Sequence, residues 1–158
     1  MKKYSELEIK EKVKIALSML LKNDAFLLEH DVNERSISHK LAEYLQQLFP
    51  DYDVDCEYNR KSLEVKKLVG IAECRNSPTD NVSPDIIVHH RNSADNVLVI
   101  EVKTPKSESA EQQDKKKLEL FTKDDKASSD YHYSLGVFIK FSKNGIDLIE
   151  WYKDGQKN

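Results

Sequence analysis

Apolar residues recur at helical spacing through the first third of the chain. They return every three or four positions over residues 5–28, which predicts an amphipathic helix that Asn23-Asp24 breaks or kinks. The same spacing predicts a second helix over residues 33–49, which Pro50 ends. The chain is therefore expected to begin with two helices.

Strand patterns follow in the middle of the chain. A short strand is expected over residues 54–58, and residues 63–69 fit either a strand or a loop. The β-branched, apolar runs 86–90 and 97–102 flank the turn-rich residues 91–95. This pattern predicts a β-hairpin with a five-residue connection.

The last third of the chain adds one helix and two strands. Residues 108–122 have a helical composition, and strands are expected over residues 133–141 and 146–152, joined through Asn144-Gly145. The resulting order is helix, helix, strand, hairpin, helix, strand, strand. That order predicts one mixed α/β domain with a sheet covered by helices, and 158 residues are too few for two ordinary domains.

Composition narrows the class of protein. No stretch approaches the ~20 apolar residues of a membrane span, and the charged start does not resemble a signal peptide, so we expect a cytoplasmic protein. The net charge of -3 argues against a protein that simply coats DNA. Cys56 and Cys74 lack the CxxC spacing of a zinc site and are expected to be buried, reduced thiols.

The candidate chemistry lies at the base of the predicted hairpin. Ser83-Pro84 precedes Asp85, and 15 residues separate Asp85 from the run Glu101-Val102-Lys103. Residues i and i+2 of a strand share a face, so Glu101 and Lys103 project together. Charged side chains at the end of an apolar strand need partners if they are buried.

The hairpin register supplies such a partner. If His90 pairs with Asn96 across the turn, then Asp85 lies opposite Glu101, and opposed residues of an antiparallel pair point to the same side. A slip of one residue would place Asp85 on the other face. In the favoured register, two carboxylates and the Lys103 ammonium converge.

Two close carboxylates suit a hard divalent cation such as Mg²⁺, for which Mn²⁺ could substitute. Asp85 and Glu101 are the predicted ligands, and the main-chain carbonyl of Val102 could add a third. A bound ion would polarise a phosphate and activate a water, and Lys103 could orient that water or stabilise the developing charge.

A third acid is predicted from helical geometry. At ~100° per residue, Glu34 falls in the middle of the apolar stripe that begins at Ile37, whereas Glu43 falls on the opposite, solvent side. Glu34 is therefore a candidate site residue. The alternative is a capping box in which Asp31 is the N-cap and Glu34 its partner.

Asp85, Glu101 and Lys103, preceded by an acid on a helix, resemble the motif of the PD-(D/E)xK nuclease superfamily. The resemblance covers about residues 32–141. It implies a restriction-endonuclease-like fold, a mixed β-sheet flanked by helices, to which the chain adds an N-terminal helix.

The resemblance also implies roles for the residues that match. Asp85 and Glu101 would bind the metal, Lys103 would act in catalysis, and Glu34 would assist. The expected activity is that of a Mg²⁺-dependent deoxyribonuclease, most simply an endonuclease, acting as a homodimer or with a partner subunit. The alternatives are an inactive nucleic-acid- or protein-binding module on the same fold, and a nuclease that acts on RNA.

Two further runs of adjacent residues could bind a ligand. Lys115-Lys116-Lys117 lies on a helix that would flank the site, so it could contact phosphates, or it could be an ordinary solvated helix face. His89 and His90 are adjacent on a strand and face opposite sides, so they cannot share one metal ion. A structural role is expected for both histidines.

Overall fold

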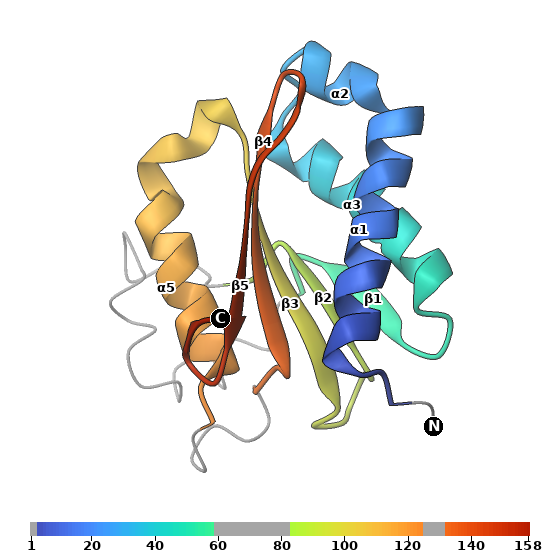
Figure 1. Cartoon of the computed structure of the whole chain (residues 1–158), viewed down its shortest axis with the longest axis vertical. Coiled ribbons are helices and arrows are strands. Elements are labelled where there is room, and N and C mark those ends of the chain that lie inside the picture. Colours follow the sequence, from blue (N-terminus) through green and yellow to red (C-terminus); the bar gives the residue numbers. More distant parts are fainter. Residues whose placement is uncertain (1–2, 59–82, 125–131) are drawn as a thin grey trace.

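The computed structural model describes residues 3–58, 83–124 and 132–158. In this part of the chain a mixed sheet has the strand order β1-β2-β3-β4-β5-β6 (Figure 1). Strands β3 and β4 are parallel, and every other neighbouring pair is antiparallel. The strands are β1 (Asp53–Cys56), β2 (Ile86–His89), β3 (Asn96–Lys103), β4 (Leu135–Ser142), β5 (Gly145–Lys153) and β6 (Gln156–Lys157).

Helices cover both faces of this sheet. Helices α1 (Glu6–Asn23), α2 (Ala25–Glu29) and α3 (Glu34–Leu48) lie on one face. The 3-10 helix η2 (Pro105–Ala110) leads into α5 (Glu111–Thr122), which packs on the other face. The predicted α/β class, with a sheet flanked by helices, is confirmed.

Local capping explains where the first helices begin. Ser5 caps α1 in a capping box with Glu8. Asn33 caps α3, because its side-chain oxygen accepts a hydrogen bond from the backbone N–H of Ser36. The capping box that would start at Asp31 is therefore wrong: Asp31 precedes the helix in a left-handed conformation (φ 54°), and Glu34 is the first helical residue.

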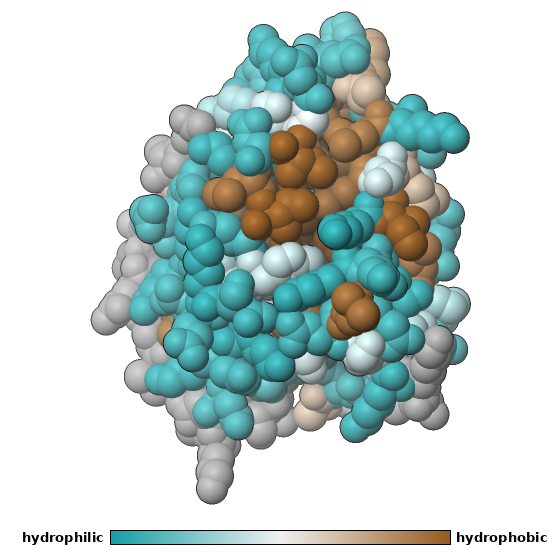
Figure 2. All heavy atoms as spheres, viewed as in Figure 1, coloured by the Kyte–Doolittle hydropathy of each residue, from teal (hydrophilic) through white to brown (hydrophobic). Residues whose placement is uncertain are grey.

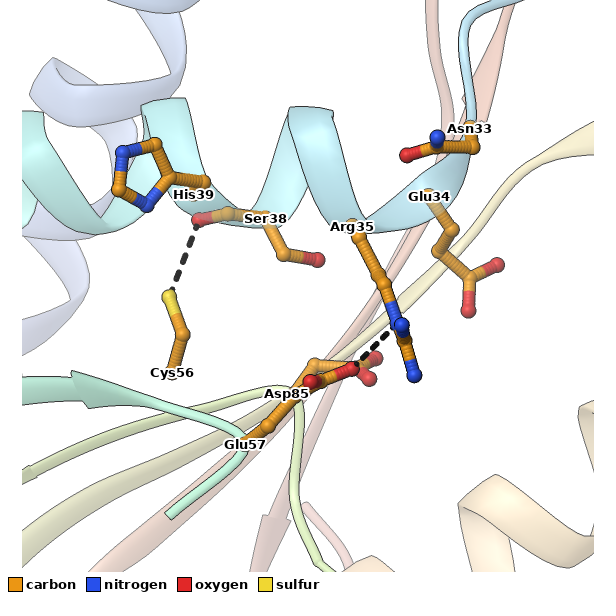
Figure 3. A pocket seen from close by; sticks show the side chains of 8 residues that line it. All are labelled: Asn33, Glu34, Arg35, Ser38, His39, Cys56, Glu57 and Asp85. Carbon is orange, nitrogen blue, oxygen red and sulfur yellow. Dashed lines mark hydrogen bonds and ion pairs between the residues drawn. The ribbon is translucent and has the colours of Figure 1, made fainter.

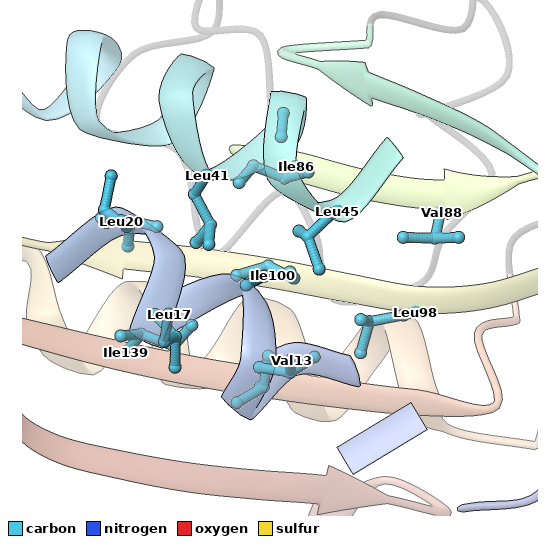
Figure 4. Packing of buried hydrophobic residues seen from close by; sticks show 14 of the residues in the cluster. Val13, Leu17, Leu20, Leu41, Leu45, Ile86, Val88, Leu98, Ile100 and Ile139 are labelled. Atoms are coloured by element: carbon cyan, nitrogen blue, oxygen red, sulfur yellow. The ribbon is translucent and has the colours of Figure 1, made fainter. Parts of the chain in front are cut away.

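The larger core lies between the sheet and the pair α1 and α3 (Figure 4). Alternate residues of each strand face this core or the smaller core under α5. The larger core includes Val13, Leu17, Leu20, Leu41, Leu45, Ile86, Val88, Leu98, Ile100 and Ile139. The smaller core includes Ile87, Val99, Leu118, Phe121 and Phe138.

Helix α5 approaches β4 closely at Gly136. A Cβ atom at this position would lie 3.0 Å from Cγ2 of Thr122 and 3.3 Å from Cδ2 of Leu118. The missing side chain therefore lets α5 pack directly on the sheet, which brings the polar residues of its first turns next to β3.

The hairpin register differs from the prediction near the turn. Ile86 pairs with Ile100 as expected, but the register shifts between Val88 and His89, so His89 and not His90 pairs with Asn96. The extra residue on β3 is Val97, and both Val97 and its neighbour Leu98 are buried in the larger core. The bulge thus adds a core residue while leaving the register at the base of the hairpin unchanged.

The ends of other helices and strands differ from the predicted ones by a few residues. The α-helix predicted over residues 108–122 begins at Glu111, because residues 105–110 form the 3-10 helix. The short strand β1 ends at Cys56, and β6 was not predicted. The ambiguous segment 63–69 lies outside the described residues.

The surface is unevenly polar. Figure 2 shows exposed apolar side chains gathered beside α1 and the β4–β5 hairpin, whereas the surface over α5 is hydrophilic. Of the helices in the described ranges, none combines the length and the apolar character that crossing a membrane would require.

The packing of α1 predicts a contrast between two leucines of that helix. Leu17→Ala removes a buried side chain and should lower the free energy of unfolding by about 2–5 kcal/mol. Leu7 is 68% exposed, so Leu7→Ala should change it by less than about 0.5 kcal/mol. Urea denaturation of both variants measures the difference, and similar losses would show that α1 is not part of the core.

Glu6 joins the start of α1 to the end of the sheet. Its carboxylate oxygens lie 2.7 Å from Nζ of Lys10 and 3.0 Å from Nζ of Lys153. Hydrogen bonds from both lysines lower the pKa of Glu6 from 4.5 to about 2.

A pH-dependent contribution to stability follows. The stabilisation by Glu6 is complete above pH 4.5 and is lost as the pH falls toward 2, because the protonated acid loses both pairs. The side chain is 35% exposed, so Glu6→Gln should cost only about 1 kcal/mol or less at pH 7 and less again near pH 3. Urea denaturation at both pH values checks this, with the exposed Glu11→Gln as the control. A deficit that stays constant with pH would contradict the assignment.

Candidate functional site

The hairpin base brings Asp85 beside the end of β3. Pairing of Ile86 with Ile100 continues toward Asp85 and Glu101. The Asp85 carboxylate accepts a hydrogen bond of 2.7 Å from the backbone N–H of Val102, which fixes it against β3. Burial raises the pKa of Asp85 to about 6, despite this hydrogen bond and the positive charge of Lys117.

Glu101 is the most buried acid of the site, with 1% of its side chain exposed. Its Oε2 accepts a hydrogen bond of 2.9 Å from Nζ of Lys117. Its Oε1 is buried and has no hydrogen-bond partner among the described residues. Burial, and then the negative charge of Asp85, raise the pKa of Glu101 well above its usual value.

Lys103 shares the site but pairs with other acids. Its Nζ lies 2.5 Å from Oδ2 of Asp114 on α5 and 3.8 Å from Oε1 of Glu34 on α3, and only 4% of its side chain is exposed. The backbone N–H of Thr104 donates a hydrogen bond to Glu34. Lys103 therefore links the helices on the two faces of the sheet.

Asp114 is a site residue that the sequence reasoning missed. Its carboxylate contacts both Lys103 and Lys117, the latter at 2.8 Å, and it is nearly buried. Asp114 precedes the buried residues Leu118 and Phe121 by four and seven positions, so it lies on the buried stripe of α5. The angular argument that identified Glu34 would have found it.

The three consecutive lysines of α5 point in different directions. Lys117 enters the site, Lys115 pairs with Glu111 and Glu150, and Lys116 is half exposed and pairs with Glu119. Consecutive helical residues diverge by about 100°, which explains why they form no common face.

The acid side chains outnumber the basic ones in this cluster. Among the described residues that contact or act electrostatically on one another here, there are four carboxyl groups and two ammonium groups. The carboxyl groups belong to Glu34, Asp85, Glu101 and Asp114, and the ammonium groups to Lys103 and Lys117. We refer to these six residues as the acid–lysine cluster.

A pocket of about 550 Å³ opens beside the acid–lysine cluster, between α3 and the ends of β1 and β2 (Figure 3). Glu34 and Asp85 belong to both the pocket wall and the cluster. Arg35 also lines the pocket, with its side chain 81% exposed and 2.8 Å from the carboxylate of Glu57. The remaining lining residues are Asn33, Ser38, His39, Cys56 and Glu57 itself.

The prediction of a buried thiol is wrong for Cys56. This residue ends the edge strand β1 and is exposed on the pocket wall. Its thiol donates a weak hydrogen bond of 3.8 Å to the backbone oxygen of Ser38, and local burial raises the pKa of the thiol to about 11. Cys74 lies outside the described residues.

The two adjacent histidines have separate partners. His89 is buried, and its Nε2 lies 2.8 Å from the carboxylate of Asp55. His90 stacks on Tyr52 at a centroid distance of 4.2 Å. The expectation that they cannot bind one ion together agrees with these opposite environments.

The side chains alone do not form a closed metal site. Within the described ranges, no three His, Cys, Asp or Glu residues are arranged to hold a metal ion. In the acid–lysine cluster the ammonium groups of Lys103 and Lys117 lie between the acids.

Comparison with protein-family models, with curated proteins and with solved structures found no match. The function must therefore be argued from the geometry of the site.

Proposed function

We propose that the chain is a Mg²⁺-dependent nuclease of the PD-(D/E)xK superfamily that hydrolyses phosphodiester bonds of DNA. The observation that carries the proposal is the buried Glu101 carboxylate near Asp85, whose Oε1 has no hydrogen-bond partner in the part of the chain that the structure describes. A buried carboxylate oxygen without a partner is costly, and a bound cation would satisfy it.

The residues fit a hard divalent ion. Asp85, Glu101 and the main-chain carbonyl of Val102 would hold Mg²⁺, and Mn²⁺ could substitute. Two more carboxyl than ammonium groups in the acid–lysine cluster leave a formal charge that one divalent ion would balance. When bound, the ion supplies Lewis-acid polarisation of the scissile phosphate.

Lys103 and Glu34, whose charged groups lie 3.8 Å apart, would both act on the substrate. Asp114 holds the Lys103 ammonium in place, so the charge is already oriented when a phosphate arrives. Glu34 is 25% exposed and faces the pocket, where it could accept a hydrogen bond from the attacking water.

The pocket beside the cluster suits the nucleotide next to the scissile phosphate. Its volume of about 550 Å³ falls within the ~300–1,000 Å³ typical of ligand pockets. Arg35 extends from its wall into solvent, where it could reach a backbone phosphate. Lys116 remains a candidate phosphate contact, whereas Lys115 and Lys117 each bind two acids.

The element order supports a restriction-endonuclease-like fold. Helix α3 precedes an antiparallel β1–β2–β3 unit, and α5 then leads to β4, which runs parallel to β3. This is the helix, strands, helix, strand core that the superfamily has, with α1, α2, β5 and β6 added. Cleavage of both strands of a duplex would need a second copy of the chain or a partner subunit.

Lys103→Ala tests the activity. Wild-type protein with Mg²⁺ should cut duplex DNA, and Lys103→Ala, shown to be folded by circular dichroism, should reduce the rate roughly 10²-fold or more, because a transition-state charge contact is lost. Lys106→Ala changes an exposed lysine nearby and should cut normally. Parallel assays on single-stranded DNA and RNA identify the substrate. Cleavage of RNA alone would favour a ribonuclease, and no cleavage of any of the three would favour an inactive binding module.

Glu34→Gln tests the helical acid. The amide keeps the shape but removes the charge, so the cleavage rate should fall roughly tenfold or more with little change in stability. Glu43→Gln on the exposed side of α3 is the matched control and should cut like the wild type. Equal rates for the two variants would reduce the catalytic set to Asp85, Glu101 and Lys103.

A further inference from the structure

Lys117 occupies an unusual place for a lysine within a charged run. Its ammonium lies 2.9 Å from Oε2 of Glu101 and 2.8 Å from Oδ1 of Asp114, and 15% of its side chain is exposed. Its neighbour Lys116 is 51% exposed and has one surface partner, Glu119. Lys117 is therefore part of the interior of the site and cannot be an ordinary solvated lysine.

The two contacts keep this buried ammonium charged. Burial alone would lower the pKa of Lys117, but the negative charges of Glu101 and Asp114 raise it above the usual value. In return, the ammonium offsets the repulsion of Glu101 by Asp85 and Asp114. It also engages only one oxygen of Glu101, which leaves Oε1 buried and without a hydrogen-bond partner among residues 3–58, 83–124 and 132–158.

We propose that Lys117 is the built-in counter-ion of the metal site. It holds Glu101 in place in the metal-free chain, and it weakens the binding of a divalent ion because both cations share one carboxylate. This inference rests on the metal site of the proposed function and assigns Lys117 a positioning role in place of phosphate contact.

The decisive measurement is Mg²⁺ affinity in the absence of nucleic acid. Lys117→Met keeps the length of the side chain and removes its charge. Its thermal unfolding in EDTA should occur at a lower temperature than that of the wild type, while its affinity for Mg²⁺, measured by calorimetric titration, should rise roughly tenfold or more. A purely structural lysine would give the opposite result, since a disrupted site binds the ion more weakly. Lys116→Met should match the wild type in both measurements.

For a second variant, we expect the affinity for Mg²⁺ to change in the opposite direction. Asp114→Asn removes a negative charge that helps to hold Lys117 and Lys103, so both ammonium groups are less compensated. Its affinity for Mg²⁺ should fall roughly tenfold. If Lys117→Met is unfolded in EDTA, addition of Mg²⁺ should restore the native circular dichroism spectrum, because the ion replaces the missing positive charge.

The outcomes separate this inference from the proposed function. Mg²⁺ affinity of Lys117→Met that is equal to or below that of the wild type overturns the counter-ion role, even if the wild type cuts DNA. If Mg²⁺ does not refold an unfolded Lys117→Met variant, the counter-ion role is also overturned. A wild type that neither binds nor responds to Mg²⁺ rejects the metal site and with it both proposals. The expected affinity changes in a chain that cuts no nucleic acid would support the counter-ion role and reject the nuclease.

Discussion

The burial of acids at the base of the β2–β3 hairpin is the constraint on which the rest of the site depends. Glu101 is buried and Asp85, on the wall of the pocket, is only partly exposed, so water cannot solvate either charge freely. Such charges are tolerated in a fold only when partners surround them. Lys117 is such a partner for Glu101, Lys103 pairs with Asp114 and Glu34, and Asp114 contacts both lysines. The packing of α5 on the sheet at Gly136 is therefore also an electrostatic requirement of the site.

The sequence predicted the parts of this arrangement that depend on periodicity. The helical angle of Glu34 and the strand face shared by Glu101 and Lys103 follow from regular geometry, and the structure has Glu34 at the start of α3 beside Lys103. The register at Ile86 agrees with the one predicted from a His90–Asn96 pair, although the structure pairs His89 with Asn96. The bulge at Val97 was not predicted, since it depends on how the larger core is filled by α1 and α3.

The partners of the lysines were harder to predict than their positions. A run of three lysines is typical of a solvated surface, and nothing in the run itself shows that Lys117 contacts the buried Glu101. Which of the three lysines enters the site depends on the buried stripe of α5 and on the close contact of this helix with β4. Both are tertiary features. The expected convergence of Lys103 with Asp85 and Glu101 likewise omitted Asp114, the acid that Lys103 contacts most closely.

The cluster also bears on stability without any ligand. Because the pKa of Asp85 is raised from 3.8 to about 6 in the folded chain, the free energy of unfolding falls as the pH rises between these two values, since ionised Asp85 is less well accommodated than the neutral acid. Any cation that binds only the folded chain would recover part of that loss by mass action. If the site binds a cation as proposed, the same acids that cost stability at neutral pH would provide its affinity. Stability would then be reduced in favour of binding, and the two lysines would limit both effects.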